Sequence, residues 1–329
     1  MKLTILSPIY NDWASLASLI PALDAALSTD GRTAAILVVD DGSQHQPDIE
    51  EKPLQLTAIT AVDVLHLRTN LGHQRAIAIG LAWLDANATP DTVVVMDGDG
   101  EDRPEDVVRL LKALEADDAV RVVFAERRRR SEGVLFALLY GLYRYVHLLL
   151  TGERVRVGNF SVIPRYLLRR LVAVDDLWNH YAAAVFHSRI PFITVPTERG
   201  TRYAGRSQMN FVALVTHGLS AMSVFGDRIG VRLLLVTCAL ISAVVSSAFV
   251  FVGWHAATGE PLPVWSLYAA AGLALLIFLM FATSLAFVFI ILAGRSNAGF
   301  LPFREFAHYV SHTSSVPVLR LNGDDVRRH

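Results

Sequence analysis

Two long runs without charge constrain the fold more than any other feature of this 329-residue chain. Residues 233–254 contain no charged side chain, and residues 264–294 are again uncharged. Each run is at least as long as the roughly 20 residues that a helix needs to cross a bilayer. A pair of buried core helices is the alternative, but core helices of globular domains rarely extend so far without a polar face. We therefore predict two transmembrane helices within residues 229–294.

Basic residues flank the two predicted spans on one side only. Arg228 and Arg232 precede the first span, and Arg295 and Arg304 follow the second. The link between the spans, residues 255–263, carries a single charged side chain, and it is acidic. Because basic residues accumulate on the cytoplasmic side of membrane helices, we predict cytoplasmic termini and an external link.

The amino terminus starts with a strand-like run and has no targeting pattern. LTILSPIY follows Met1 and Lys2 directly, without a cleavage-site motif, so no secretory signal is predicted. Cys238 is the only cysteine and lies in the first predicted span, which excludes an intramolecular disulfide. With 53% hydrophobic residues the chain is too apolar for an ordinary soluble protein, so we expect a multi-pass membrane protein without a nucleic-acid partner.

Strand-like and helix-like runs alternate through the first 200 residues. The strand-like runs are LTILS, AILVVD, AVDVLHL, TVVVM and VRVVFA, separated by helix-like stretches at residues 13–27, 72–84 and 105–116. This alternation is typical of a mostly parallel sheet covered by helices. We predict a cytoplasmic, Rossmann-like α/β domain over residues 1–210. A nicotinamide dehydrogenase is disfavoured because no Gly-x-Gly-x-x-Gly follows the first strand.

Two further apolar stretches are short for a membrane span and contain polar residues. They cover residues 134–150 and 211–228, and we predict helices that lie in the membrane interface, with core helices as the alternative. The remaining residues, 295–329, are expected to form a cytoplasmic tail. Within it LPFREFAHYV suggests a third interface helix, and SVPVLRLNGDD suggests an extended segment that pairs with a sheet edge or another subunit.

Acidic residues follow the fourth predicted strand directly. TVVVM leads into Asp97, Asp99, Glu101 and Asp102 at the carboxyl end of the strand, where ligands of open α/β sheets bind. Carboxylates spaced so closely repel one another unless a cation lies among them, and hard oxygen ligands suit Mg²⁺ or Mn²⁺. A solvated turn that caps the helix starting near Pro104 is the alternative. A calcium-binding EF-hand is excluded because its sixth loop position, normally glycine, is Asp102.

Short polar groups follow the first two predicted strands. Because the carboxyl ends of neighbouring parallel strands meet at one edge of a sheet, these groups are expected to line one pocket. Carboxylates there accept hydrogen bonds from a base N–H and from ribose hydroxyls, and Gly42 permits a tight turn. An ordinary Asp-Asp-Gly-Ser turn is the alternative. The predicted nucleoside-binding residues are Pro8, Tyr10, Asn11, Asp12, Asp40 and Asp41.

Cationic residues supply candidate phosphate ligands. Asn70 precedes a predicted helix with Arg75 on its first turn, which suits a diphosphate, although a plain helix cap uses the same residues. Guanidinium groups bind phosphate bidentately, and some of the arginines are also explained by membrane topology alone. Glycine and serine around Arg202 suggest a loop that closes over a ligand. The predicted acceptor-phosphate ligands are Arg127, Arg130, Arg199, Arg202 and Ser207.

The motifs in this order resemble a known family. SPIYND, VVDDGS, NLGHQRAIAIG and DGDGEDRPED are similar to the GT-A glycosyltransferases of family 2. The later VGNFSVIPR, ERGTRYAGRSQMN and paired spans are similar to its polyprenyl-phosphate branch, which includes dolichol-phosphate mannosyltransferase and bactoprenol glucosyltransferase. The resemblance covers roughly residues 1–295. Each motif alone is moderately specific, whereas their order together with two carboxy-terminal spans is strong.

The resemblance implies an inverting transfer of a sugar from a UDP- or GDP-sugar to a membrane polyprenyl phosphate. It places Asp97, Gly98 and Asp99 at the cation and diphosphate, with Glu101 as a third metal ligand where the family commonly has glutamine. The Gln-x-x-Arg-Trp motif of processive synthases is missing, which favours a single transfer. Some relatives form tetramers, but the sequence leaves the stoichiometry of this chain open.

One departure from the family bears on the mechanism. Relatives usually have Gly-Asp-Phe-Arg-Leu where this chain has Asn159 and Ser161, and that aspartate is sometimes proposed as a base. An amide accepts no proton at neutral pH, but a phosphate monoester with a second pKa of about 6 is already largely dianionic. We hypothesise that Asn159 orients the acceptor while Arg127 and Arg202 hold its phosphate.

Two other functions stay open at this point. An inactive membrane scaffold with the same fold is favoured by Asn159 and opposed by the intact Asp97 and Asp99. A glycosyltransferase with a hydroxyl acceptor, such as a glycolipid, needs a deprotonating carboxylate, for which Asp102 or Asp175 is the candidate.

Overall fold

The computed structural model describes residues 2–44, 54–117, 120–127, 134–153, 157–204, 211–296 and 300–320. The chain divides into two compact units. We call the first the sheet unit; it comprises Met1–Leu139, Val155–Val224 and Phe300–His329. We call the second the helical unit; it comprises Tyr140–Arg154 and Phe225–Gly299.

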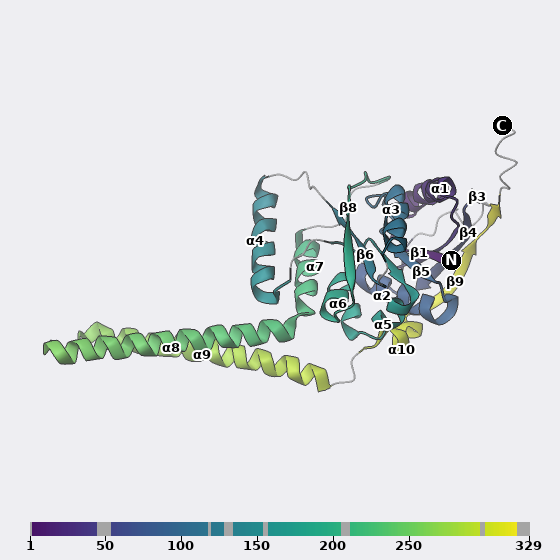
Figure 1. The fold of residues 1–329 in the computed structure, drawn as a ribbon. Helices are drawn as coiled ribbons and strands as arrows, with labels where there is room; N and C mark the ends of the chain where they lie inside the picture. The colour runs from purple at the N-terminus through teal and green to yellow at the C-terminus, as the bar shows by residue number, and fades with distance from the viewer. Residues whose placement is uncertain are drawn as a thin grey trace. The chain divides into compact units, whose positions relative to one another are not determined.

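An eight-stranded mixed sheet forms the centre of the sheet unit, with the order β8-β6-β7-β5-β1-β2-β4-β9 (Figure 1). Neighbouring strands are parallel except where β7 pairs with β5 and β6 and where β9 pairs with β4. The strands are β1 Leu3–Ile9, β2 Ala34–Asp40, β4 Ile59–Leu67, β5 Thr92–Val95, β6 Val122–Arg127, β7 Ser161–Pro164, β8 Phe192–Thr197 and β9 Val310–Val316. A second sheet pairs β3 Leu54–Leu56 with β10 Val318–Arg320.

Helices cover both faces of the sheet, which explains why its central strands are almost wholly apolar. Successive residues of β1 alternate between the two layers, because Ile5 packs in one core cluster and Leu6 in the other. The first cluster includes residues of α1 and α3, and the second includes residues of α2, α5 and α6. These helices are α1 Trp13–Thr29, α2 His73–Trp83, α3 Pro104–Glu115, α5 Arg165–Leu171 and α6 Tyr181–His187.

The five strands and three helices predicted from the first 200 residues are confirmed, and with them the α/β fold class. The sequence analysis missed β7, a four-residue antiparallel strand inserted between β5 and β6. It ends at Pro164 and follows a loop, so it has neither the length nor the flanking signals of the parallel strands.

The segment after the second long helix belongs to the sheet unit. LPFREFAHYV forms no interface helix: α10 Pro302–Glu305 is one turn, Phe306–His308 is a 3₁₀ turn, and the backbone N–H of Phe303 donates to Val172 O at 3.2 Å. The predicted pairing of the extended segment with a sheet edge is confirmed, because β9 joins β4 and β10 joins β3.

The helical unit contains two helices long and apolar enough to cross a membrane, α8 Gly226–Thr258 and α9 Val264–Ser296. Their side chains are mostly exposed, as expected for a lipid-facing pair rather than a globular core. Gly230 on α8 leaves no room for a side chain, since an added Cβ would lie 3.2 Å from Val288 on α9. Both predicted spans are therefore present as helices.

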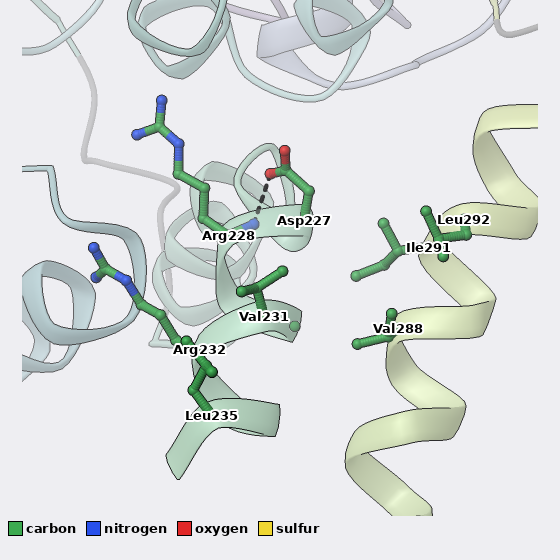
Figure 2. A pocket seen from close by; sticks show the side chains of 9 residues that line it. Asp227, Arg228, Val231, Arg232, Leu235, Val288, Ile291 and Leu292 are labelled. Carbon is green, nitrogen blue, oxygen red and sulfur yellow. Dashed lines mark hydrogen bonds between the residues drawn. The ribbon is translucent and has the colours of Figure 1, made fainter. Parts of the chain in front are cut away.

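A pocket of about 520 Å³ lies at the amino-terminal end of α8 (Figure 2). Its two arginines turn toward other partners: Arg228 donates to Glu153 at 2.8 Å, and Arg232 donates to the carbonyl of Leu149 at 2.7 Å. That carbonyl belongs to the last turn of α4 Val134–Thr151, so Arg232 stabilises the helix end. The lining residues are Asp227, Arg228, Gly230, Val231, Arg232, Leu235, Val288, Ile291 and Leu292.

The two shorter apolar stretches are also helical, as predicted. They form α4 and α7 Phe211–Ser223. Their position in a membrane interface stays a prediction.

Candidate active site

The acidic loop, residues 97–102, is folded by its own carboxylates. Asp102 Oδ2 accepts the backbone N–H of Asp97 at 3.0 Å, and Asp99 Oδ1 accepts that of Glu101 at 2.9 Å. Gly100 has a φ of +89°, and a Cβ there would lie 2.3 Å from the ring of Tyr203. The loop therefore requires glycine at position 100, both for its conformation and for the close approach of Tyr203.

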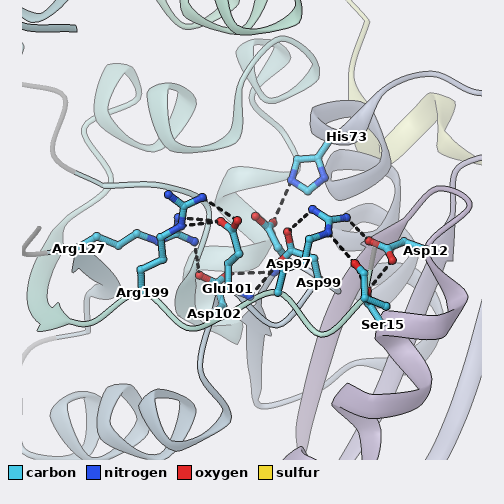
Figure 3. A network of polar contacts seen from close by, with 11 residues as sticks. Asp12, Ser15, His73, Asp97, Asp99, Glu101, Asp102, Arg127 and Arg199 are labelled. Carbon is cyan, nitrogen blue, oxygen red and sulfur yellow. Dashed lines mark hydrogen bonds and ion pairs between the residues drawn. The ribbon is translucent and has the colours of Figure 1, made fainter. Parts of the chain in front are cut away.

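Three arginines predicted from the sequence converge on this loop (Figure 3). Arg127 donates to Asp102 at 2.8 Å and lies 3.5 Å from Glu101, and Arg199 donates to both oxygens of Glu101. These contacts place Glu101 between two guanidinium groups. The segment that carries Arg199 also binds the loop through its backbone, because Gly200 N donates to Glu101 O at 2.8 Å.

The third arginine, Arg202, bridges the acidic loop to the first strand loop. It donates to Asp99 at 3.0 Å and pairs with Asp12, which also accepts from Ser15 at 2.6 Å. The structure thus brings together the predicted acids and arginines from four separate segments. Arg130 and Ser207 lie outside the described residues.

The acids of the loop have different proton affinities. Burial and the neighbouring Asp97 raise the pKa of Asp102 to about 7, against the opposing effect of Arg127. Burial also raises the pKa of Asp99. Burial acts the same way on Asp97, but His73 and Arg127 outweigh it and lower the pKa of that carboxyl. Asp97 is therefore the most fully ionised of these three carboxyl groups at neutral pH.

The donor set fits a divalent cation that takes most of its ligands from a diphosphate and water. Asp97 Oδ1 is buried without an aligned hydrogen bond, and the imidazole nitrogen His73 Nε2 lies 3.1 Å from it. Among the described residues, no three carboxylate, imidazole or thiolate groups form a ready-made cation site. Mg²⁺ commonly uses one or two carboxylates together with substrate phosphates. Asp97 and Asp99 would supply the carboxylates. Glu101, expected as a third ligand, is instead paired with arginines.

The loops that follow β1 and β2 lie side by side, as predicted for a nucleoside pocket. Ile9 is the register partner of Asp40, so both strands end at the same level. Asn11 donates its backbone N–H to Ser43 Oγ at 2.8 Å and accepts that of Gln44 at 2.9 Å. Pro8 is buried in β1, and Tyr10 is half-buried directly after it.

The two neighbouring acids at the end of β2 already have protein partners. Asp40 accepts from Ser43 N at 3.0 Å, and Asp41 accepts the backbone N–H groups of Leu71 at 2.7 Å and Gly72 at 2.8 Å. Asp41 thereby ties β2 to the turn that contains Asn70. A carboxylate has about four lone-pair positions, so both acids retain capacity for a ligand.

A fall in pH should weaken the hydrogen bonds from Leu71 and Gly72 to Asp41. Burial raises the pKa of Asp41 to about 6, although the two backbone amides act against it. As the pH falls through 6, one oxygen becomes a hydroxyl and stops accepting an N–H, so we expect donor affinity to fall about threefold to tenfold between pH 7 and pH 5. A folded pKa above the unfolded value stabilises the fold as the pH falls, so this titration alone does not cause unfolding. The measurement is donor KM against pH; a flat profile for Asp41→Asn and an acid-sensitive wild type support this account, and identical profiles contradict it.

Arg75 contacts an aromatic ring. Its guanidinium lies over the ring of Trp178, 5.1 Å from the centroid, which is a cation–π contact. Its role at a diphosphate stays a prediction.

A closed hydrogen-bonded ring holds Asn159, and two of its four members, Gln74 and Tyr181, were not predicted from the sequence. The backbone N–H of Tyr181 donates to Gln74 Oε1 at 2.7 Å, and Gln74 Nε2 donates to Asn159 Oδ1 at 3.1 Å. Tyr181 Oη lies 2.6 Å from Ser161 Oγ, which donates to Asn159 O at 2.9 Å. Asn159 and Ser161, the two departures from the family motif, thus belong to the same hydrogen-bonded ring.

The ring fixes the orientation of the side-chain amide of Asn159. Because a backbone N–H occupies Gln74 Oε1, the Nε2 of Gln74 must face Asn159 Oδ1, and Asn159 Nδ2 then points toward His73 Nε2 at 2.9 Å. His73 was not singled out from the sequence, although it opens α2 directly after Gly72. Asn159 therefore presents hydrogen-bond donors near Asp97, as an anion ligand does and a base does not.

The fold and this site define a glycosyltransferase of the GT-A type. The chain belongs to glycosyl transferase family 2, whose model matches residues 4–172. This membership confirms the enzyme class that the sequence motifs predicted.

Curated relatives and solved structures are similar to this chain over about seven tenths of its length. An undecaprenyl-phosphate 4-deoxy-4-formamido-L-arabinose transferase of Klebsiella pneumoniae subsp. pneumoniae is 25% identical over 253 residues, which cover 69% of this chain and 72% of the relative. The protein of the same name from Enterobacter sp. is 28% identical over 261 residues, covering 70% and 72%. A crystal structure of glucosyl-3-phosphoglycerate synthase from Mycobacterium tuberculosis, in complex with Mn²⁺, UDP-glucose and phosphoglyceric acid, aligns with a TM-score of 0.48 and 18% identity, covering 70% of this chain and 80% of that chain.

Proposed function

We propose that this enzyme transfers one sugar, with inversion, from a nucleotide sugar to the phosphate of a membrane polyprenyl phosphate. The observation that carries the proposal is the contact of Asp99, Glu101 and Asp102, which share a loop with Asp97, with arginines from two other segments. Carboxylates suit a cation-bound diphosphate, and guanidinium groups suit a second phosphate, so one site has ligands for both substrates. The names of the two relatives, which state undecaprenyl phosphate, support this acceptor class.

The donor side of the site consists of the loops after β1, β2 and β5. Asp97 and Asp99, with Gly98 close to the end of β1, would hold Mg²⁺ or Mn²⁺ and the diphosphate. Bound there, the cation supplies charge stabilisation for the leaving nucleoside diphosphate. Asn11, Asp40 and the turn at Asn70 form the nucleoside side, with UDP and GDP as candidate carriers.

The acceptor side consists of the arginines. Arg127, Arg199 and Arg202 are proposed to bind the lipid phosphate, with Arg130 and Ser207 as further ligands. Arg202 and a diphosphate-bound cation use the same carboxylate, Asp99. Donor binding therefore competes with the Arg202–Asp99 ion pair and favours release of Arg202 toward the acceptor phosphate.

Proton transfer contributes little in this proposal because the acceptor is already ionised. Asn159 donates to the acceptor or sugar, and the surrounding ring keeps its donor end in the site. Positioning and charge stabilisation then account for the rate.

Asn159→Asp tests the role of the amide. We expect a change in transfer rate of less than about tenfold, because no missing base limits the reaction. The measurement is kcat for the lipid-linked product, with Asn179→Asp as a control outside the ring. A gain of several orders of magnitude would show that the natural chain lacks an essential base.

A hydroxyl acceptor is the second candidate, and one observation favours it. The pKa of Asp102, raised to about 7 by burial and Asp97, is near the value suited to a general base. Its carboxylate, however, is held by Arg127 and by the backbone of Asp97. Asp175 offers no comparable site, since it starts a short 3₁₀ turn.

The acceptor class is tested by offering undecaprenyl phosphate and undecaprenol in parallel to the purified chain with a nucleotide sugar and Mg²⁺. We expect product from the phosphate only. Formation of product from undecaprenol, abolished in Asp102→Asn, would establish the hydroxyl mechanism. Consumption of the nucleotide sugar without glycosylation of either lipid would exclude both acceptor classes. An inactive scaffold would leave the donor intact.

We also propose that α8 and α9 cross the bacterial inner membrane with the sheet unit in the cytoplasm. The uneven distribution of Arg228, Arg232 and Arg304 relative to the link at residues 255–263 supports this orientation. A homo-oligomer is an expectation from the resemblance alone.

A further inference from the structure

Strand β9 follows both membrane helices in the chain, yet it lies at the edge of the sheet beside β4 (Figure 1). Its register places Ser314 opposite Val64 and His312 opposite His66. His66 is the penultimate residue of β4 and is the register partner of Asp40 on β2. The last described strand of the sheet therefore lies two strands from the proposed nucleoside pocket.

Hydrogen bonds connect β9 to Asp40 through one buried imidazole. Ser314 Oγ lies 2.9 Å from His66 Nε2, and His66 Nδ1 lies 3.1 Å from Asp40 Oδ2. The ring of His312 stacks on His66 with centroids 4.3 Å apart. His66 and Asp40 are each only 3% exposed, so the carboxylate depends on this imidazole where water contributes little.

The connection continues from Asp40 into both nucleoside loops. The other oxygen of Asp40 accepts the N–H of Ser43 at 3.0 Å, and Ser43 Oγ accepts the N–H of Asn11 at 2.8 Å. Asn11 has a φ of +52°, a left-handed conformation that asparagine tolerates better than most residues. The loop after β1 is therefore held partly by Ser43, and the loop after β2 partly by His66.

We propose that Ser314 and His66 are positioning residues for the donor site. Through them, β9 holds Asp40, Ser43 and Asn11 in the arrangement that binds the nucleoside. Donor binding then depends on a segment that the chain reaches only after its two membrane helices. The inference rests on the proposed function only for the identity of the ligand.

The strand offers a matched control. Ser315 is adjacent to Ser314 and also bonds a side chain of β4, donating to Asp63 Oδ1 at 2.6 Å. Ser314→Ala and Ser315→Ala thus remove the same group from the same strand, and with it the hydrogen bond to His66 in the first variant and the one to Asp63 in the second. Ser314→Thr retains the hydroxyl and suits a strand.

The first readout is amide hydrogen exchange at Asn11 and Ser43 in the full-length chain. We expect Ser314→Ala to accelerate exchange at both positions by about threefold to tenfold, the effect of losing one hydrogen bond, while Ser315→Ala and Ser314→Thr match the wild type. Equal exchange in Ser314→Ala and Ser315→Ala would overturn the proposal.

The second readout is binding of UDP and of GDP with Mg²⁺. Ser314→Ala should raise the Kd by about threefold to tenfold and the donor KM equally, with kcat within about twofold, because the chemistry lies elsewhere. An equal rise in Ser315→Ala would show a general loss of stability and contradict the proposal. A wild type that binds neither nucleotide would refute the donor class, and hydrogen exchange would still decide the positioning role.

Discussion

Asp97→Asn should reduce sugar transfer by at least about 10³-fold while the fold stays intact. The substitution keeps the shape of the side chain but removes the negative charge of Asp97, whose pKa is lowered, and with it the ligand proposed for the cation and diphosphate. The substitution gives up the 3.1 Å contact between Asp97 Oδ1 and His73 Nε2, a pair of partly exposed side chains, so the effect on stability should be small. The measurements are the rate of lipid-linked product formation and the thermal midpoint.

Asp106→Asn is the matched control for this substitution. Like Asp97, Asp106 has a buried carboxylate oxygen without an aligned hydrogen bond; it pairs with Arg109 at 3.0 Å on the first turn of α3, outside the site. Its activity should stay within about twofold of the wild type. Equal losses in the two variants, or an Asp97→Asn enzyme that still transfers at the natural rate, would remove the basis for the proposed cation site.

Arg127→Gln should reduce transfer by about 10²-fold and also destabilise the sheet unit. Arg127 is the partner of Asp102, a carboxyl with 2% of its side chain exposed. Removing a guanidinium from a buried pair leaves a charge without compensation, but Asp102 has a pKa already raised to about 7 and will take up a proton. This response limits the expected cost to about 2 kcal/mol.

A double variant separates the two effects. Arg127→Gln with Asp102→Asn replaces the ion pair by two amides, so stability should recover while transfer stays low, because the acceptor phosphate has lost the guanidinium of Arg127. The measurements are urea unfolding and the KM for undecaprenyl phosphate. Recovery of activity in the double variant would show that Arg127 acts only on the fold.

The parallel strands β1, β2, β4, β5 and β6 could be predicted because each is an apolar run, whereas the parallel strand β8 was not predicted. The acidic and polar groups after β1, β2 and β5 followed from the same pattern, since parallel strands present their carboxyl ends at one edge. Strand β9 lacked this signal: its sequence, VSHTSSV, is mostly polar because it forms the sheet edge and most of its residues are exposed. Only the extended pattern further along the chain hinted at pairing.

The contacts between acids and arginines could not be predicted from spacing. Glu101 was expected beside a cation, but Arg127 and Arg199 reach it from positions 26 and 98 residues away. The ring around Asn159 shows the same limit, because Tyr181 and Gln74 are 107 positions apart. A departure from a family motif was visible in the sequence, whereas the partners that give it a purpose were visible only in three dimensions.

Mass spectrometry of the lipid product tests the central claim most directly. The purified full-length chain is incubated with undecaprenyl phosphate, a panel of UDP- and GDP-sugars, and Mg²⁺ or Mn²⁺, with a chelator in a parallel reaction. The account predicts a lipid that retains its phosphate and gains the mass of one sugar residue, formed from one donor of the panel and abolished by the chelator. Activated sugars that stay intact beside the acceptor, or transfer that ignores the chelator, would contradict it.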